Sequence, residues 1–142
     1  MDIPSKLHLQ IVSADRSLVN EQVDEVEIPG AEGYFGVLPG HTAMLALLGA
    51  GELWYRIGND RTYMAVAFGF AEIQPDKVTV LAQIAEHAEE IDVARAEAAK
   101  KRAEERLHAH HPGIDIDFER ARIAMLKSLI RLQVASRARI RS

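Results

Sequence analysis

The arginine at position 95 stands in an unfavourable place for a cation, which raises the question of what its charge binds. Asp92 is a good helix N-cap, because its carboxylate can accept hydrogen bonds from the free N–H groups of the first turn. Arg95 then falls in that first turn, at the positive end of the helix dipole. The segment 91–96 therefore predicts an anionic partner for Arg95, either Asp92 itself or an anion from elsewhere.

Cations on two expected helices could together bind a phosphate group. Arg95 and Arg102 are seven residues apart and share one helix face, and Lys127 and Arg131 share a face of the next helix. In an antiparallel pair of helices these side chains would converge, and the guanidinium fork suits phosphate. The alternative is that acidic residues neutralise the cations on the surface, namely Glu97, Glu104 and Glu105.

Other catalytic and metal-binding patterns are missing from the sequence. It has no cysteine, no Gly-x-Ser-x-Gly turn and no Gly-Lys-Ser/Thr phosphate loop. The histidines His108, His110 and His111 cluster at a helix end, but no cysteine or spaced acidic ligand accompanies them. We therefore expect solvated histidines, with no metal site and no catalytic residue.

The glycines of segment 30–41 resemble a nucleotide-binding fingerprint only superficially. Gly30, Gly33 and Gly36 are spaced by three, but no helix pattern follows them to receive a pyrophosphate. The spacing is typical of tight turns that need a positive φ. The adjacent aromatic residues Tyr34 and Phe35 at the expected tip could still form a contact surface.

Charge is distributed unevenly along the 142 residues. All 21 acidic residues precede Arg120, whereas the segment from Arg120 to Ser142 holds seven of the 17 basic residues. The net charge of −4 therefore conceals a basic C-terminal end, which either meets an anionic partner or is a solvated helix face. The basic residues are Arg120, Arg122, Lys127, Arg131, Arg137, Arg139 and Arg141.

Residues 1–88 read as short β-strands. Apolar residues alternate with polar ones over 7–11 and, less regularly, over 23–28. The segments 53–57 and 62–67 flank Gly58-Asn59-Asp60, which is a strong hairpin signal, and 78–82 follows a Pro75-Asp76 turn. Many closely spaced strands with no long helical pattern between them favour an antiparallel sandwich or barrel.

The remaining residues read as two helices. Residues 93–109 form one helical pattern, Pro112 and Gly113 break it, and a second helix is expected from about Phe118 to about Arg137, capped by Asp115 or Asp117. The expected fold is thus α+β, with an N-terminal antiparallel β-sandwich (1–88) and a C-terminal antiparallel two-helix hairpin (89–142). No apolar run approaches the ~20 residues of a membrane span.

Three blocks of the sequence together resemble the epsilon subunit family of bacterial rotary ATP synthases. The resemblance covers nearly the whole chain, and its most specific motifs are Gly-x-Leu-Pro-Gly-His at 36–41 and Val-Thr-Val-Leu at 78–81. The other matching parts are 9–13 with 26–30, 32–41, 69–73 and the helix start at 92–96. The resemblance implies a ten-stranded β-sandwich followed by a helix hairpin.

The family resemblance also implies a noncatalytic role in the central stalk of a proton-translocating ATP synthase, which couples rotation to ATP synthesis. The expected partners are the gamma subunit, the membrane ring subunits and the catalytic beta subunits, at the cytoplasmic face of the cell inner membrane. The basic second helix would reach the catalytic subunits and inhibit ATP hydrolysis. The turn that would contact the ring comprises Ala31, Glu32, Gly33, Tyr34, Phe35, Gly36, Val37 and Leu38.

Several members of this family bind ATP through an Ile/Leu-Asp-x-x-Arg-Ala motif, which is complete here at 91–96. No cofactor is required, and ATP would be a regulatory ligand. Lys127 stands where the strongest ATP binders have arginine, and lysine lacks the bidentate fork. The residues implied for the site are Glu86, Ile91, Asp92, Arg95, Ala96, Arg102, Lys127 and Arg131.

Two other functions fit parts of the sequence. A free-standing nucleotide-sensing module could use the same helix hairpin, and it would differ from the stalk subunit in having no need of partner subunits. Binding to nucleic acid through the basic helix is disfavoured, because the cations are not interleaved with aromatic residues and the pI is about 5.9.

Overall fold

The computed structural model describes residues 3–109 and 116–141, and the side chains of 116–117 and 139–141 are not part of the description. The chain divides into two compact units, Met1–His87 and Ala88–Ser142, and each is described by itself. The expected turn at 110–113 and the expected cap Asp115 lie outside the described residues. Among the described residues, no helix has the length and apolar character needed to cross a membrane.

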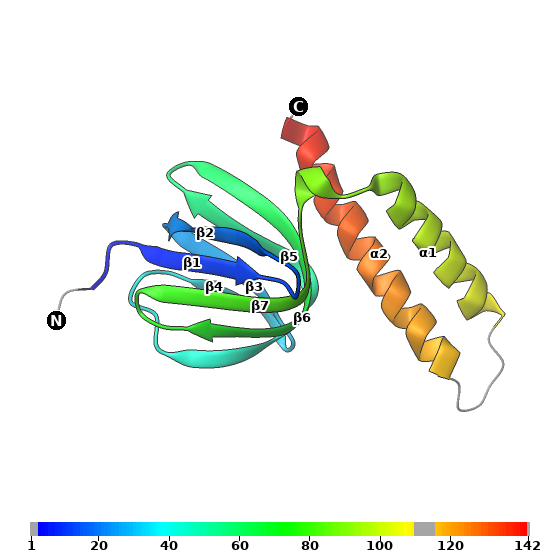
Figure 1. The fold of residues 1–142 in the computed structure, drawn as a ribbon, viewed down its shortest axis with the longest axis horizontal. Helices are drawn as coiled ribbons and strands as arrows, with labels where there is room; N and C mark the ends of the chain where they lie inside the picture. The colour runs from blue at the N-terminus through cyan, green and yellow to red at the C-terminus, as the bar shows by residue number, and fades with distance from the viewer. Residues whose placement is uncertain (1–2, 110–115, 142) are drawn as a thin grey trace. The chain divides into compact units, whose positions relative to one another are not determined.

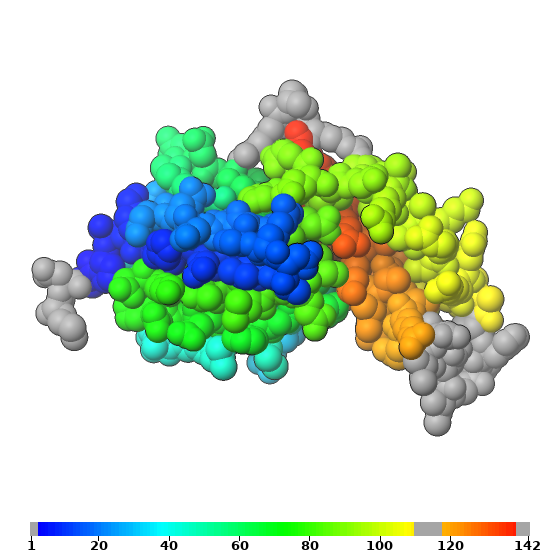
Figure 2. Space-filling view, in the orientation of Figure 1, coloured from blue at the N-terminus to red at the C-terminus, as the bar shows by residue number. Residues whose placement is uncertain are grey.

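The first unit is a β-sandwich built from one twisted sheet that folds over on itself (Figure 1). The strand order across the sheet is β2-β1-β7-β6-β5-β3-β4. Figure 2 shows that side chains of β1, β2 and β7 fill the space between these strands on one face of the unit. The strands are β1 (Leu7–Val12), β2 (Ser17–Val23), β3 (Glu25–Gly30), β4 (Gly33–Val37), β5 (Met44–Ile57), β6 (Asp60–Ile73) and β7 (Lys77–His87).

The sheet is mixed, which corrects the expectation of a wholly antiparallel sandwich. Strand β1 pairs in parallel with β7, with His8 opposite Lys77 and Val12 opposite Leu81, while the remaining pairs are antiparallel. The described residues contain seven strands rather than ten, because β5 and β6 each continue for 14 residues.

Alternation along the strands places the core between the two layers. Leu7, Leu9 and Ile11 of β1 are fully buried, whereas the residues between them are half-buried, as the period of two predicts. The opposing layer contributes Leu53 and Met64, which lie opposite each other on β5 and β6 and are also fully buried. Burial of these apolar side chains is the main stabilising term of the unit.

A bend in β5 and β6 follows from the backbone at Phe68 and Gly69. The regular β5–β6 pairing skips from Leu48–Gly69 to Ala50–Ala67. Phe68 has φ 61°, a left-handed value rare for a bulky residue, and Gly69 has φ 120°. A Cβ atom on Gly69 would lie 2.0 Å from the carbonyl oxygen of Leu81, so only glycine allows β7 to approach here.

Ion pairs fasten one end of the sandwich. Asp24, between β2 and β3, pairs with Lys6 and accepts a hydrogen bond of 2.7 Å from the N–H of Gly58 in the β5–β6 turn. The hydrogen bonds from Lys6 and from Gly58 lower the pKa of Asp24. Arg56 donates to Glu25 at 2.9 Å and to the carbonyl of Gly58 at 2.9 Å. Turns far apart in sequence are thereby joined.

The second unit begins with the short 3₁₀ helix η1 (Ala88–Glu90), followed by α1 (Val93–His108) and α2 (Ile116–Arg141). The two long helices lie side by side and run antiparallel, and η1 packs against α2 (Figure 1). The hairpin fold of the C-terminal residues is therefore confirmed, although α2 extends further toward the C-terminus than the sequence pattern indicated.

Except for Val134 of α2, the described buried positions of both helices are occupied by small residues at intervals of seven. These are Ala96 and Ala103 on α1 and Ala121, Ser128 and Ala135 on α2. Small side chains let helix backbones approach closely, but each one buries little apolar area and contributes little to stability. The Oγ of Ser128 donates to the carbonyl oxygen of Ala124 at 2.8 Å, so this buried hydroxyl is satisfied within its own helix.

Candidate functional site

The position of Arg95 at the start of α1 is fixed by its main chain, and its charged side chain takes no part. Asp92 is the N-cap, and its Oδ1 accepts a hydrogen bond of 3.1 Å from the main-chain N–H of Arg95. The carbonyl oxygen of Asp92 accepts the first helical bond, from Ala96, at 3.0 Å. Among the described residues the exposed guanidinium of Arg95 has no ion-pair partner. The capping function predicted for Asp92 is confirmed.

The neighbouring motif residues Ile91 and Ala96 have a packing role. Both are buried, Ile91 between η1 and α1 and Ala96 on the face of α1 that carries Ala103. The side chains of this motif therefore separate into two groups, with apolar residues directed inward and Arg95 exposed at the surface.

Arg102 is also exposed on α1, and the acidic residues near it do not neutralise it. Glu104 pairs instead with Lys100, with 3.8 Å between Nζ and Oε1. Within the described part of the chain Arg102 forms no ion pair. Two guanidinium groups, those of Arg95 and Arg102, thus extend from one side of α1 with their charges uncompensated by side chains of the helix.

The candidate residues of α2 differ from those of α1. Lys127 and Arg131 are half-buried, four residues apart on the helix, and each has an interaction partner in the structure. Glu86, the remaining candidate, belongs to the first unit, where it is half-buried near the end of β7 and likewise has a partner.

The basic residues of α2 lie along most of its length. Arg120 is exposed, and Arg122 pairs with Glu119 of its own helix at 3.1 Å. Arg137 is half-buried and has an interaction partner, and Arg139 and Arg141 belong to the last turns of the helix.

The turn between β3 and β4 is tightly specified by its glycines and by one hydrogen bond. Gly30 pairs with Gly33, so Ala31 and Glu32 form a two-residue hairpin loop. Gly33 has φ 139°, which a larger residue would adopt only with strain. The N–H of Ala31 donates to the carbonyl oxygen of Leu47 at 2.8 Å, which ties the loop to β5.

The tip is exposed as the sequence suggested, with Tyr34 54% exposed, but its two aromatic residues are also anchored. The Tyr34 hydroxyl accepts a hydrogen bond of 3.1 Å from the N–H of Glu52, and a Cβ on Gly51 would lie 2.4 Å from that hydroxyl oxygen. Phe35 is half-buried against the core, Val37 is fully buried, and Leu38 is exposed. Segment 31–38 therefore presents only some of its side chains to solvent.

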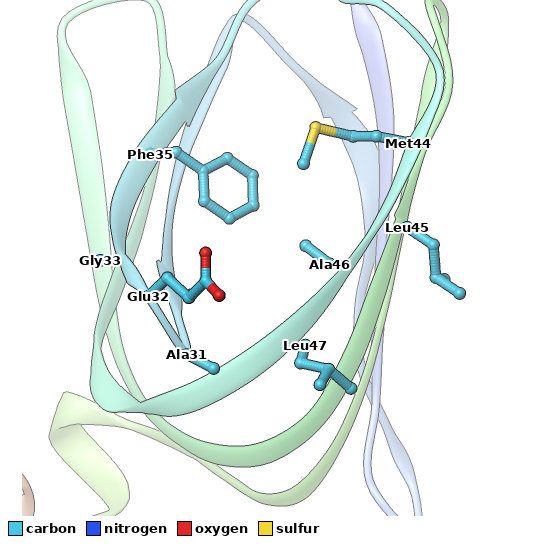
Figure 3. Close-up of a pocket in the computed structure, with 9 residues that line it drawn as sticks. Ala31, Glu32, Gly33, Phe35, Met44, Leu45, Ala46 and Leu47 are labelled. Atoms are coloured by element: carbon cyan, nitrogen blue, oxygen red, sulfur yellow. The ribbon is translucent and has the colours of Figure 1, made fainter.

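A cleft opens between this loop and the beginning of β5. Figure 3 shows Phe35 facing Met44 and Ala46 across it, with the Glu32 carboxylate directed into the space between them. Its volume is about 360 Å³. The lining residues are Gly30, Ala31, Glu32, Gly33, Phe35, Met44, Leu45, Ala46 and Leu47.

An exposed apolar row crosses the middle of the sheet, a feature that the sequence analysis missed. Leu47 of β5 lies opposite Phe70 of β6, and Phe70 lies opposite Leu81 of β7. Their exposed fractions are 70%, 40% and 39%, and Leu45 beside them is 68% exposed. We call these four residues the apolar row. In the sequence, these residues are single apolar side chains at solvent-facing positions of three separate strands. Only the pairing of the strands brings them together.

No metal-binding cluster of three or more His, Asp or Glu side chains occurs among residues 3–109 and 116–141. A metal centre needs several ligand side chains that converge on one point.

Comparison with known proteins gives matches in both units. The family model of the ATP synthase delta/epsilon chain β-sandwich domain matches residues 6–88, and that of the delta/epsilon chain long α-helix domain matches residues 89–136. The ATP synthase epsilon chain of Solibacter usitatus strain Ellin6076 is 43% identical over 135 residues, which is 95% of this chain and 99% of the relative.

Two solved structures share the fold. A chain in the cryo-EM structure of the Euglena gracilis mitochondrial ATP synthase, OSCP/F1/c-ring, aligns with a TM-score of 0.69 and 24% identity over 99% of this chain and 84% of its own. A chain of the Tetrahymena thermophila mitochondrial ATP synthase central stalk and c-ring aligns with a TM-score of 0.57 and 12% identity, over 96% and 98%. From these matches over both units, the chain belongs to the family of ATP synthase epsilon chains, which are noncatalytic subunits of that enzyme.

Proposed function

We propose that the chain is the central-stalk epsilon subunit of a proton-translocating ATP synthase, associated with the membrane through the complex. The observation that carries this proposal is the match of both units to the family, together with two exposed surfaces on the sandwich. Of the structures with similar folds, the Euglena gracilis one is described as OSCP/F1/c-ring and the Tetrahymena thermophila one as central stalk and c-ring. Rotation of such a subunit with the stalk would couple ion flow to ATP synthesis.

The two surfaces of the sandwich suit two partners. The apolar row leaves large hydrophobic side chains in solvent on adjacent strands, which is typical of a protein–protein contact. We assign it to the gamma subunit. The 31–38 turn, with its cleft and the exposed Leu38, is assigned to the membrane ring subunits.

The helix pair suits a regulatory role. After Glu119 the second helix carries basic residues only, so an acidic surface of the catalytic beta subunits would attract it and restrain ATP hydrolysis. The seam of alanine and serine between α1 and α2 favours a weakly held pair. Deletion of residues 120–142 should therefore raise ATP hydrolysis by the assembled enzyme without preventing assembly.

ATP is proposed to bind the helix pair as a regulatory ligand. The support is the pair of exposed guanidinium groups, Arg95 and Arg102, whose charges have no ion-pair partner in the described chain. Lys127 and Arg131 on α2 add positive charge, and Asp92 and the apolar Ile91 lie at the start of α1.

Reconstitution tests the proposal as a whole. The chain should bind to an ATP synthase depleted of its epsilon subunit and should lower the ATPase rate of that enzyme. Absence of both effects would contradict the stalk assignment. Binding of ATP by a chain that fails to associate with the enzyme would instead favour a free-standing nucleotide-sensing module.

A further inference from the structure

We propose that Phe68 is a positioning residue for the apolar row, because its left-handed backbone turns β6 over and thereby directs Phe70 outward. The inference deepens the proposed function and rests on it, since the apolar row is the surface assigned to the gamma subunit. Phe68 itself is half-buried, and it would act through Phe70 rather than through a contact of its own.

The side chains of β6 change the face on which they lie at Phe68. Met64 and Val66 belong to the hydrophobic core before this point, and Ala71 belongs to it afterwards. In a regular strand, residues two apart share a face, so a strand with Met64 and Val66 inside would also place residue 70 inside. Phe70 is instead 40% exposed, whereas Ala71 is fully buried. The core therefore receives an alanine, and the surface receives an aromatic ring.

The backbone of Phe68 accounts for this change of face. Within β6, all of whose residues the structure describes, only Phe68 (φ 61°) and Gly69 (φ 120°) have a positive φ. A bulky residue rarely adopts a left-handed φ, because its Cβ atom comes too close to the following carbonyl oxygen. Such conformations persist where the surrounding structure holds them, and they are concentrated at functional sites. Phe68 is half-buried and has an interaction partner, as a held residue would.

The neighbouring strands change face at the same level. The core residues pass from Leu48 to Leu53 on β5 and from Ala82 to Ala85 on β7. Both pairs are separated by an odd number of positions, so each strand has also turned over between them. The pairing of β6 with β5 and with β7 is regular on either side of Phe68 but omits it on both edges. We call this line across the three strands the crease.

The apolar row lies directly beside the crease. Leu47, Phe70 and Leu81 are paired with one another across β5, β6 and β7, and Phe70 is two positions beyond Phe68. If β6 continued without the left-handed turn, Phe70 would move to the core face and the row would lose its middle member. The exposed leucines on either side would then no longer form a continuous apolar surface. Phe68 thus shapes the row without being part of it.

Cysteine labelling measures the orientation of β6 in the absence of any partner, because the chain has no cysteine of its own. Phe70→Cys and Ala71→Cys each introduce one thiol, the first at an exposed position and the second at a buried one. With Phe68 in place, a maleimide should react with the thiol at position 70 at least about tenfold faster than with that at position 71, since a buried thiol reacts only during transient opening.

Substitutions at position 68 separate backbone conformation from side-chain packing. Phe68→Gly and Phe68→Asn accept a positive φ and should preserve the ratio of the two labelling rates. Phe68→Val is similar in size to Phe68→Asn but is β-branched, and it should reduce the ratio at least about fivefold. Thr62→Val, which places valine in a regular part of β6, is the matched control and should keep the ratio. A role in apolar packing alone predicts the opposite order, with valine better than asparagine or glycine.

Binding to ATP synthase depleted of its epsilon subunit gives the functional readout. Phe68→Val should raise the dissociation constant at least about fivefold relative to Phe68→Asn, because the row would lose its central ring. Phe70→Ser removes that ring directly and should weaken binding to a similar extent. Urea unfolding establishes that each variant is folded. If Phe68→Val does not fold, Phe68→Ala takes its place, since alanine also resists a left-handed φ, and its labelling ratio should fall below that of Phe68→Gly.

The outcomes separate this inference from the proposed function. Failure of the wild-type chain to bind the enzyme would overturn the proposed function, while the labelling ratio would still report the orientation of β6. A ratio that stays the same in Phe68→Val, or in Phe68→Ala where that variant replaces it, would overturn the inference alone. A reduced ratio combined with binding as tight as that of the wild type would also overturn it, because binding would then not depend on the position of Phe70.

Discussion

Asp92 and Arg95 are joined through a main-chain hydrogen bond and not through their opposite charges. The Oδ1 of Asp92 accepts from the Arg95 N–H at 3.1 Å, and within the described residues no ion pair links the two side chains. The carboxylate therefore stabilises the helix, while the guanidinium is left for an external anion.

The two roles can be separated by substitution. Asp92→Ala should lower the stability of the helix pair by about 1 kcal/mol, since it removes the cap. Asp92→Asn keeps an acceptor at the same place and should cost much less. Circular dichroism during thermal unfolding of the full chain measures both, and equal losses for the two variants would contradict the capping role.

Arg95→Ala should leave the thermal midpoint nearly unchanged in the absence of ligand, because its side chain is exposed and has no ion-pair partner among the described residues. ATP should raise the midpoint of the wild type by binding the folded form, and the substitution should abolish that rise. Arg106→Ala, another exposed arginine of α1, is the control and should keep the response. No shift of the wild type at millimolar ATP would falsify the ATP site.

The Tyr34 hydroxyl provides a test of the β4–β5 contact. Tyr34→Phe leaves the N–H of buried Glu52 without its acceptor and should lower the unfolding free energy by about 1–3 kcal/mol. Gly51→Ala should also destabilise, because its Cβ would lie 2.4 Å from the Tyr34 oxygen. In urea unfolding, the double variant should lose less than the two single losses combined; full additivity would mean that the two residues act independently.

Substitution by alanine should lower the free energy of unfolding by different amounts at Gly69 and at Gly58. Both have positive φ, but a Cβ at Gly58 would meet open space, whereas at Gly69 it would meet the Leu81 carbonyl oxygen at 2.0 Å. Gly58→Ala should lower the free energy of unfolding by about 1–2 kcal/mol, because a residue with a Cβ atom is strained at this positive φ. Gly69→Ala should cost clearly more, because β7 would have to move. Equilibrium urea unfolding compares them, and equal costs would contradict the proposed close approach of the strands.

The Asp24 ion pair should make the sandwich sensitive to acid. The hydrogen bonds from Lys6 and Gly58 lower the pKa of Asp24 in the folded state, so its stabilising effect is complete above the unfolded value of about 3.9 and is lost as the pH falls through the lowered value. Asp24→Asn should therefore unfold at a lower temperature than the wild type at pH 7. The two midpoints should converge toward pH 2. Asp15→Asn, at an exposed site without an ion pair in the described chain, is the control and should unfold at the same temperature as the wild type at pH 7.

Local features of the fold could be predicted from the sequence because their causes are local. Alternation gave the burial of Leu7 and Leu9, and Gly58-Asn59-Asp60 marked the turn between β5 and β6. Asp92 was predicted as a cap, since its chemistry acts within three residues. The second helix was found with its ends displaced, since it begins at Ile116 and ends at Arg141 where about Phe118 and about Arg137 were expected.

Features that depend on strand pairing could not be predicted from one sequence. Gly49 and Gly69 interrupt the apolar pattern, so the full lengths of β5 and β6 were missed. The apolar row and the Glu32 cleft each need residues from different strands, such as Phe35 of β4 and Met44 of β5. Their register is fixed by tertiary contacts, and no local spacing reports it.

The parallel pairing of β1 with β7 has a consequence for folding of the chain. Strand β1 is synthesised first but has β7 as one of its two neighbours, and His8 lies opposite Lys77. This contact closes a loop that spans nearly the whole β unit. The chain loses the conformational entropy of that loop before the contacts that compensate for the loss have formed. A nascent chain must therefore leave one side of β1 unpaired until the last strand has emerged from the ribosome.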